Sequence, residues 1–565
     1  MGFLRDKPDK RLPCLHGQPF VRRRTANFLL DDHRDKGQNM RHIFSRLKPA
    51  LTYILIIILL LAGIFLAVRF LRFGFELRPW EETEETGGEG QEETFGERQE
   101  ESGGPEETDG EWMTDEETES CPGPAEGGEI GEEPETAPEA EEESPPDLML
   151  ASDLHYLNPS LHDDGPAFWK MVEEDDGKPS QYSEEMTDAL LAEAARKRPD
   201  ALILSGDLTH NGERQNHLEL AEKLRKLQEE GVTVLVIPGN HDIQNPIASA
   251  YFGEERQSAA NLKSGEEFYE IYREFGYDDA VSRDEASLSY VYALDDDHWV
   301  MMLDSCQYKD RNHVGGRIGE ETLSWMEDQL KLAAEQGISV LPVAHHNLLS
   351  ESRMYKTECT LENNQEVISL LEQYRIPLYV SGHLHAQRIK KHKEEPGMED
   401  GEYGITEIVL GPYSIPPCEY GYLSWDEEDR LSFQVEEADV AAVAAAAGSQ
   451  DETLLCFGRE GTELVRSNVR RKLEQAHFPV SEEMAELMET LYANLYVDYC
   501  AGFPIDRRAV TSTRGYGLWM RAAPDSRYVR EMEEMMLDTE VSHRQWSQQQ
   551  EKLSEEEEPA AEPAE

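Results

Sequence analysis

The chain has 565 residues, too many for a single hydrophobic core, so we expect more than one globular domain together with appended segments. It carries 116 Asp and Glu against 54 Lys and Arg, which gives a formal net charge of −62. This surplus disfavours nucleic-acid binding through the acidic regions, because phosphate backbones are bound by Lys and Arg. The 7 cysteines include no C-x-x-C pair and are odd in number, so they do not indicate a disulfide framework, although a single bridge stays open.

The chain begins with a basic segment that is followed by an uncharged apolar run. Residues 1–48 contain 12 Lys or Arg against 5 Asp, and residues 49–68 contain no charged side chain. At about 1.5 Å per residue a helix of this length spans roughly 30 Å, the thickness of a bilayer's hydrocarbon core. We therefore predict a single transmembrane helix over residues 49–72. A cleaved signal peptide is the alternative, but the run is long and no small-x-small cleavage site follows it.

The positive-inside rule gives the expected topology. The basic residues 1–48 would be cytoplasmic, so the protein would be anchored in the cell membrane with the residues after the helix extracytoplasmic. Residues 73–146 are predicted to be a disordered acidic linker, because residues 81–146 hold 27 Asp or Glu and one basic residue, Arg98. This linker would either hold the following part of the chain away from the anionic membrane surface or be a solvated segment without a specific role.

Polar side chains follow five apolar runs that we predict as buried strands. The runs cover residues 148–151, 201–204, 232–237, 340–343 and 377–380. They lead into Asp153-Leu154-His155, Gly206-Asp207, Gly239-Asn240-His241-Asp242, Ala344-His345-His346 and Gly382-His383-Leu384-His385. Helical spacing at residues 184–198, 217–230 and 320–336 indicates βαβ units. Loops at the carboxyl ends of such strands meet in one crevice, where ligands bind.

The donor atoms in these loops indicate a metal site. Carboxylate and amide oxygens and imidazole nitrogens suit Mn, Fe, Zn or Ni, and the absence of Cys argues against a thiolate-type structural zinc site. About eight donors are too many for one ion, so two divalent or transition metal ions that share one carboxylate are expected. Two metals about 3.5–4 Å apart are the usual arrangement for phosphoester displacement.

The order D-x-H, G-D, G-N-H-D, H, G-H-x-H over residues 147–437 resembles the signature of the calcineurin-like metallophosphoesterases. The resemblance implies a four-layer α/β/β/α sandwich with a dinuclear centre between its sheets, and a hydroxide bridging the two ions that attacks phosphorus. It also implies a full set of metal ligands: Asp153, His155 and His385 for one ion, Asn240, His345 and His383 for the other, and Asp207 between them.

The same resemblance implies the catalytic residues. His241 matches the family's non-ligand histidine, which contacts the substrate phosphate and can protonate the leaving oxygen, and Asp242 would orient the His241 ring. His346 is interpreted either as a ligand or as a neighbouring pocket residue, and His345 aligns as the ligand. Purple acid phosphatases place a Tyr three residues after the bridging Asp, where this chain has His210, so a ferric phenolate site is not expected.

Residues 206–212 and a helical domain after the catalytic one resemble the cyclic-nucleotide phosphodiesterase branch. We therefore expect a membrane-anchored phosphodiesterase for a cyclic-nucleotide-like phosphodiester. A phosphomonoesterase or a lipid or cell-wall phosphodiesterase on the same site is the first alternative, because substrate choice depends on loops rather than on these motifs. An inactive extracytoplasmic binding protein is the second alternative.

The remaining segments complete the expected domain organisation. An insertion at residues 156–180, with Phe168 and Trp169, would form either one wall of the substrate cleft or an ordinary surface loop. Strands at 405–410, 421–425 and 430–435 would close the catalytic domain, residues 147–437. Helices at 461–477, 481–499 and 527–539 would form a C-terminal α-helical domain, residues 449–545, before an acidic disordered tail, residues 546–565.

Overall fold

The computed structural model describes residues 145–548, except residues 176, 350–351, 356, 393–403 and 475–479. The predicted cytoplasmic segment, residues 1–48, and the predicted transmembrane helix, residues 49–72, lie outside the described residues, as do nearly all of the predicted linker and tail. Within the described ranges, no helix combines the length and the apolar character that crossing a bilayer requires.

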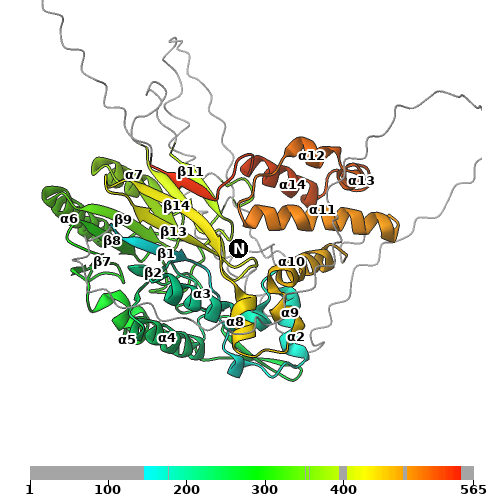
Figure 1. The fold of residues 1–565 in the computed structure, drawn as a ribbon, viewed down its shortest axis with the longest axis horizontal. Coiled ribbons are helices and arrows are strands. Elements are labelled where there is room, and N and C mark those ends of the chain that lie inside the picture. Colours follow the sequence, from blue (N-terminus) through cyan, green and yellow to red (C-terminus); the bar gives the residue numbers. More distant parts are fainter. Residues whose placement is uncertain are drawn as a thin grey trace, which may run out of the picture. The chain divides into compact units, whose positions relative to one another are not determined.

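The first of two large sheets has six strands in the order β15-β14-β13-β1-β2-β3. β1, β2 and β3 are parallel, whereas β13, β14 and β15 continue the sheet in antiparallel fashion. The strands are β1 (Asp147–Ala151), β2 (Ala201–Leu204), β3 (Thr233–Val236), β13 (Glu419–Trp425), β14 (Leu431–Glu437) and β15 (Gln545–Ser547). β15 follows the C-terminal helices, so the end of the described chain returns to the edge of this sheet (Figure 1).

The second sheet has seven strands in the order β11-β12-β10-β9-β8-β7-β6. β8, β9, β10 and β12 are parallel, and antiparallel strands lie at both edges. The strands are β6 (Ser282–Arg283), β7 (Tyr290–Ala293), β8 (His298–Leu303), β9 (Ser339–Ala344), β10 (Leu378–Ser381), β11 (Arg388–Lys391) and β12 (Thr406–Val409). The five apolar runs predicted as strands are therefore confirmed as β1, β2, β3, β9 and β10.

Side chains of the second sheet are buried on both of its faces. Alternate residues along its strands join one of two apolar clusters, as the period of two in a strand requires. One face packs in the cluster that also contains β1, β2 and β3, and its members include Val300, Met302, Leu341, Val343 and Val380. The other face packs in a separate cluster with α6 (Glu320–Gln336) and α7 (Asn364–Gln373), and its members include Met301, Leu303, Val340 and Tyr379.

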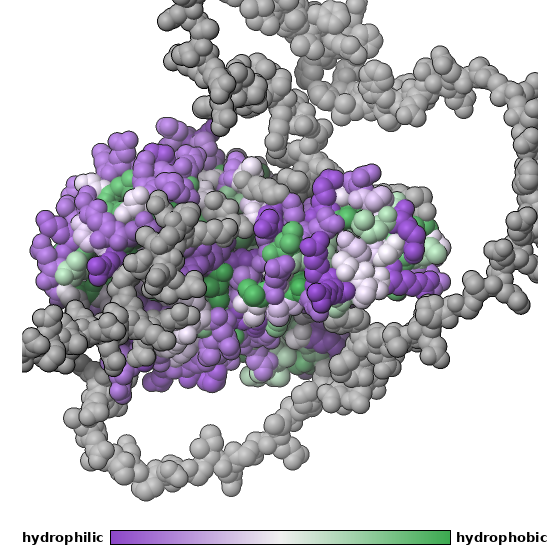
Figure 2. Space-filling view, turned by 90° about the horizontal axis from the view of Figure 1, so that it is seen from above, coloured by the Kyte–Doolittle hydropathy of each residue, from purple (hydrophilic) through white to green (hydrophobic). Residues whose placement is uncertain are grey.

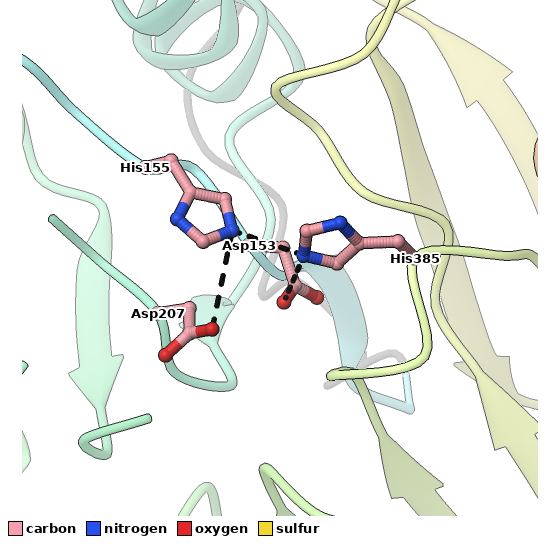
Figure 3. Close-up of side chains that lie close together, drawn as sticks. All are labelled: Asp153, His155, Asp207 and His385. Atoms are coloured by element: carbon pink, nitrogen blue, oxygen red, sulfur yellow. Dashed lines mark hydrogen bonds and ion pairs between the residues drawn. The ribbon is translucent and has the colours of Figure 1, made fainter. Parts of the chain in front are cut away.

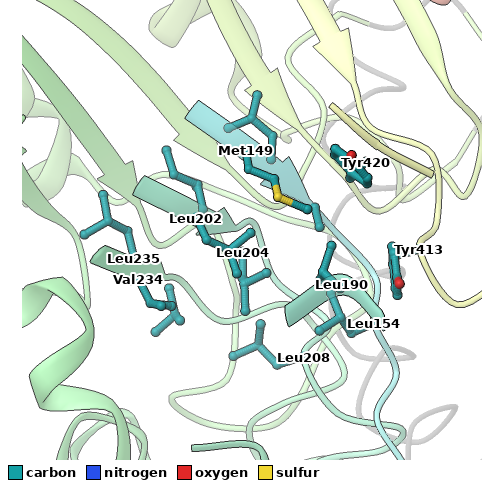
Figure 4. Close-up of a cluster of buried hydrophobic side chains, with 14 of the residues drawn as sticks. Met149, Leu154, Leu190, Leu202, Leu204, Leu208, Val234, Leu235, Tyr413 and Tyr420 are labelled. Carbon is teal, nitrogen blue, oxygen red and sulfur yellow. The ribbon is translucent and has the colours of Figure 1, made fainter. Parts of the chain in front are cut away.

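The first sheet is covered by α3 (Ser183–Lys197) and α4 (Arg214–Glu229), which bury Leu190 and Leu220 against it. Figure 4 shows part of this cluster, to which Leu190 of α3 and Met149 of β1 both belong. Helices therefore flank two facing sheets, the α/β arrangement that was expected for the catalytic part. The helix predicted at residues 320–336 is confirmed as α6, and it ends at the C-cap Gly337, whose φ of 77° few other residues adopt without strain.

A C-terminal helical region packs in a further apolar cluster, which also contains Leu384, Val409 and Ile415 of the catalytic part. Its main helices are α10 (Phe457–Glu474), α11 (Glu482–Cys500), α12 (Arg507–Ser512), α13 (Arg514–Ala522) and α14 (Arg527–Asp538). α10, α11 and α14 correspond to predicted helices, whereas α12 and α13 were not predicted. One stripe of α11 faces the cluster, because Leu495 and Tyr499 are buried and Leu487 and Leu491 pack against it.

The remaining elements are short or lie at the surface. They are η1 (Pro159–Leu161), α2 (Pro166–Glu174), η2 (Ser180–Tyr182), β4 (Ser249–Phe252), β5 (Glu255–Ser258), α5 (Gly265–Tyr272), η3 (Arg273–Tyr277), α8 (Val440–Ala446) and α9 (Glu452–Leu455). The face of the described residues seen in Figure 2 is mostly hydrophilic, with small hydrophobic spots between the polar side chains.

Candidate metal centre

The predicted ligands lie on loops that leave the carboxyl ends of β1, β2, β3, β9 and β10. Five of them have a positive φ: Asp153, His155, Asp207, His383 and His385, between 45° and 66°. Side chains other than glycine adopt this region rarely, and such conformations concentrate at functional sites. Gly206 shows how closely the loops approach, because a Cβ there would lie 2.6 Å from His345 Nδ1.

The first group of donor atoms comes from Asp153, His155, Asp207 and His385, all of them buried. His155 Nε2 lies 3.0 Å from His385 Nε2 and 3.9 Å from Asp207 Oδ2. His385 Nε2 lies 3.3 Å from Asp153 Oδ1. Figure 3 shows these four side chains pointing toward one another, Asp153 and His155 from the loop after β1, Asp207 from the loop after β2 and His385 from the loop after β10.

The second group of donor atoms comes from Asp207, His345 and His383, with Asn240 beside them. His345 Nε2 is 3.4 Å from Asp207 Oδ2, 3.2 Å from His383 Nδ1 and 3.2 Å from Asn240 Oδ1. Asp207 belongs to both groups. The structure thus brings all seven predicted ligands together and places Asp207 between the two sets.

Hydrogen bonds to backbone carbonyl oxygens leave one ring nitrogen of His345 and one of His383 available for a metal. His345 Nδ1 lies 3.0 Å from the Ser205 carbonyl oxygen, and His383 Nε2 lies 2.8 Å from the Glu358 carbonyl oxygen. An imidazole N–H that donates to a carbonyl leaves the other ring nitrogen as a lone-pair donor. His345 therefore presents Nε2 and His383 presents Nδ1 to the shared carboxylate.

The donor set fits metal ions. Donors 2.0–2.2 Å from one ion and at right angles to each other lie about 3 Å apart, close to the separations found in both groups. Burial alone would raise the pKa of Asp207, but the charges of His345 and His241 outweigh it and hold that pKa well below its usual range. The shared residue is therefore an anionic carboxylate at neutral pH, as a bridging ligand must be.

His241 lies beside the donor groups but is held by a different set of contacts. Its Nδ1 is 2.9 Å from the His210 carbonyl oxygen and 3.2 Å from Asn211 Oδ1, so Nδ1–H donates there and Nε2 faces the centre. Nε2 is 3.9 Å from Asp207 Oδ2, and the His241 ring meets the His155 ring edge-on at 4.8 Å. The His241 side chain remains 29% exposed, so a substrate can reach it.

The predicted role of Asp242 is wrong. Its carboxylate accepts hydrogen bonds from the backbone N–H groups of Leu208, Thr209 and Gly239 and from the Thr209 hydroxyl. The side chain points into the loop after β2, away from the His241 ring, whose Nδ1 is bound to His210 and Asn211. Asp242 therefore holds the loop of Asp207 in shape instead of orienting an imidazole.

Replacing Asp242 with alanine is expected to lower the free energy of unfolding by about 3 kcal/mol, because several buried donors lose their acceptor. Denaturant unfolding of the full-length variant measures this loss. Asp163→Ala is the matched control, since Asp163 also accepts backbone N–H bonds, from Gly165 and Gly253, but at the surface. Equal losses for the two variants would show that the buried network around Asp242 is of no special importance.

Two other histidines have contacts that remove them from the ligand set. Both ring nitrogens of His346 have hydrogen-bond partners: Nδ1 lies 2.8 Å from Ser305 Oγ, and Nε2 lies 2.9 Å from the Val314 carbonyl oxygen. His346 is therefore a residue beside the ligands. His210, which stands where purple acid phosphatases have Tyr, points away to Asp175 with an Nε2–Oδ2 separation of 3.3 Å. Neither belongs to the two donor groups.

Sequence reasoning missed several residues that support the centre. Asn312 Nδ2 donates to the carbonyl oxygens of Asn240 and Ile243, at 2.6 and 2.8 Å, and so fixes the loop that carries Asn240 and His241. Asn312 lies in a loop after β8 without any motif, so its sequence carries no signal for this role. Gln387, two residues after His385, is clamped by the Cys500 carbonyl oxygen and by the His543 carbonyl oxygen. The helical region thereby supports a ligand loop.

The chain is similar to known proteins in both sequence and fold. The family model of the calcineurin-like phosphoesterases matches residues 147–387. A 3′,5′-cyclic-nucleotide phosphodiesterase of Nostoc sp. is 24% identical over 202 residues, which are 35% of this chain and 61% of that protein. The glycerophosphodiester phosphodiesterase GpdQ of Enterobacter lignolyticus is 24% identical over 224 residues, 40% of this chain and 66% of that protein.

The chain therefore spans about two thirds or less of the length of these curated relatives. Among solved structures, a dimetal phosphatase from Danio rerio is similar with a TM-score of 0.37 and 14% identity. The match covers 52% of this chain and 97% of that one.

Proposed function

Residues 147–387 belong to the calcineurin-like phosphoesterases, and from this premise we propose that the protein is a dinuclear metal-dependent phosphodiesterase. The observation that carries the proposal is the position of Asp207, whose carboxylate belongs to both groups of donor atoms. Two adjoining sites with a common carboxylate suit in-line displacement at phosphorus, which needs charge stabilisation on both the attacking and the leaving oxygen.

Each residue has a proposed role. Asp153, His155 and His385 would hold one ion, Asn240, His345 and His383 would hold the other, and Asp207 would bind both. When bound, such ions supply a nucleophile from water at neutral pH and Lewis-acid stabilisation of the phosphoryl oxygens. His241 Nε2 faces the same space, where it would contact a phosphoryl oxygen and hold the proton that the leaving oxygen needs.

A phosphodiester is favoured over a phosphomonoester as the substrate because of the names of the relatives, and not because of the geometry of the metal centre. The Nostoc relative is named for 3′,5′-cyclic nucleotides and GpdQ for glycerophosphodiesters, and both are phosphodiesters. The phosphomonoesterase, the lipid or wall-polymer phosphodiesterase and the inactive binding protein are the competing outcomes of one experiment.

That experiment uses the full-length protein in detergent. Elemental analysis is expected to find two metal ions per chain, and a panel of 3′,5′-cyclic AMP, a glycerophosphodiester and an aryl phosphomonoester is assayed with Mn²⁺. We expect at least one diester to be cleaved faster than the monoester. A faster monoester would establish the phosphatase, and a protein that takes up no metal and cleaves no ester in the panel would end the proposal.

We also propose that residues 49–72 anchor the protein in the cell membrane with the catalytic domain extracytoplasmic. The support is the uncharged run at residues 49–68 after 12 basic residues in the first 48. Intact cells should then cleave an added diester that does not cross membranes. Cleavage that begins only after the cells are lysed would place the domain inside and leave the chemistry unchanged.

A further inference from the structure

The ring of His241 is held at Nδ1 by two neutral acceptors. They are the carbonyl oxygen of His210, 2.9 Å away, and the side-chain oxygen Oδ1 of Asn211, 3.2 Å away. Asp242, the next residue in the chain, binds backbone N–H groups with its carboxylate instead. The amide of Asn211 therefore makes the contact with the imidazole that was expected of a carboxylate.

Asn211 is itself held in place by further hydrogen bonds. Only 4% of its surface is exposed, and its Nδ2 lies 2.8 Å from His210 Nδ1. Its backbone N–H donates to Glu213 Oε2 at 2.8 Å, and the buried Glu213 also accepts from the Ser249 backbone N–H at 2.9 Å. Turning the amide away from His241 would leave buried polar groups without partners, which costs free energy. The acceptor oxygen is therefore fixed before a substrate arrives.

The loop that carries Asn211 lies directly against the backbone of His241. Gly212 has a φ of 75°, and a Cβ at that position would lie 2.7 Å from the His241 carbonyl oxygen and 2.8 Å from that of Asp242. Asn245 joins the two segments, because its Nδ2 lies 3.2 Å from the His241 carbonyl oxygen and 3.4 Å from Asn211 Oδ1. The amide and the imidazole are thus held at a fixed separation.

The orientation of His241 depends on these contacts at Nδ1. A single hydrogen bond would leave the ring able to turn about its side-chain bonds, whereas two acceptors from different residues restrict that rotation. The side chain of His241 is 29% exposed, and its Nε2 lies 3.9 Å from Asp207 Oδ2 without belonging to the donor groups. A general acid acts only within hydrogen-bond reach of the leaving oxygen, and a misplacement of about 1 Å can cost roughly 100-fold in rate.

Stability of the loop alone does not account for the position of the Asn211 side-chain oxygen. The loop after β2 already has acceptors for its N–H groups, since Asp242 binds those of Leu208 and Thr209 and Glu213 binds that of Asn211. Within the described part of the chain, the donors to Asn211 Oδ1 are the side chains of His241 and Asn245. The oxygen therefore serves the position of the imidazole and not the loop backbone.

We propose that Asn211 is a positioning residue, which holds the imidazole of His241 so that Nε2 faces the phosphoryl group and the leaving oxygen. This inference rests on the proposed phosphodiesterase function and adds a residue that neither donor group contains. It assigns the orienting contact to a neutral amide, four residues after Asp207, in place of the carboxylate of Asp242.

The test is a double-mutant cycle in kcat, with the full-length protein loaded with Mn²⁺ and with 3′,5′-cyclic AMP and a glycerophosphodiester as substrates. Asn211→Ala is expected to lower kcat by about 10- to 100-fold and to leave the metal content at that of the wild type. In a protein that already carries His241→Ala, the same substitution should have no further effect, because an orienting contact has no consequence once the ring is gone. Asn211→Asp should recover most of the rate, since a carboxylate oxygen also accepts from Nδ1–H.

Asn468→Ala is the matched control, a buried asparagine of α10 that accepts a hydrogen bond from Arg471, and its kcat is expected to equal that of the wild type. A wild-type kcat in Asn211→Ala, or an equal fold loss with and without His241, would overturn the inference and leave the proposed function standing. If Asn211→Ala does not fold, Asn211→Asp decides: a kcat within about 10-fold of the wild type supports the contact, and a larger loss with both metals bound overturns it. If the wild type binds no metal and cleaves no ester, the proposed function fails and the inference with it.

Discussion

Replacing Asp207 with asparagine is expected to empty or disorder both metal sites. Asp207 Oδ2 lies 3.4 Å from His345 Nε2 and 3.9 Å from His155 Nε2, so the same oxygen faces both groups of donor atoms. An amide keeps one neutral oxygen and loses the charge that would hold two cations side by side. Residues outside the first ligand sphere already cost 10- to 100-fold in metal affinity when they are changed, so the loss here should exceed about 100-fold.

Elemental analysis of the dialysed variant and its diesterase rate are the two measurements. Asp304→Asn is the matched control, since Asp304 is also a buried carboxylate at the end of a strand, but it accepts hydrogen bonds from Leu288 N and the Tyr308 hydroxyl instead of facing the centre. Burial raises the pKa of Asp304, so a neutral amide is a mild change there. An Asp207→Asn protein that retains two metals and the full rate would refute the shared carboxylate.

The ligand set was accessible from the sequence because each ligand follows a strand at fixed spacing. An apolar run of four to six residues that ends in Asp, Asn or His encodes both the strand and the side chains at its carboxyl end. The order of the motifs then supplied the assignment of Asp153, His155 and Asp207 to neighbouring positions. The structure brings these side chains together, and their roles as metal ligands are proposed.

The interactions that the sequence concealed are those between distant segments. Asp242 follows His241 directly, yet its carboxylate accepts hydrogen bonds from the backbone N–H groups of Leu208 and Thr209. Buried N–H groups require acceptors, and the sequence does not show that the nearest acceptor for these two is Asp242. The contact of the loop at Gly177 with α10 and α11 likewise joins segments that are far apart in the sequence, and no local pattern indicates it. α13 was missed because Gly515 and Gly517 lower its intrinsic helix propensity, which tertiary burial overrides.

His241→Ala is expected to keep both metals while kcat falls by about 10²- to 10⁴-fold. His241 is anchored by Nδ1 to the His210 carbonyl oxygen and lies outside both groups of donor atoms, so its removal leaves every proposed ligand in place. What is lost is a donor that faces the phosphoryl group and the leaving oxygen. His298→Ala is the control, because His298 lies at the opposite end of β8, bound to Asp295 and Asp429.

The leaving group separates proton donation from binding. A diester with an alkyl leaving group needs a proton on the departing oxygen, whereas a 4-nitrophenyl diester departs as a stable phenolate. If His241 supplies that proton, His241→Ala should slow the alkyl diester far more than the nitrophenyl diester, because general acid catalysis matters in proportion to the basicity of the leaving oxygen. Equal slowing of both would assign His241 to phosphate contact alone, and loss of metal together with the rate would make it a ligand.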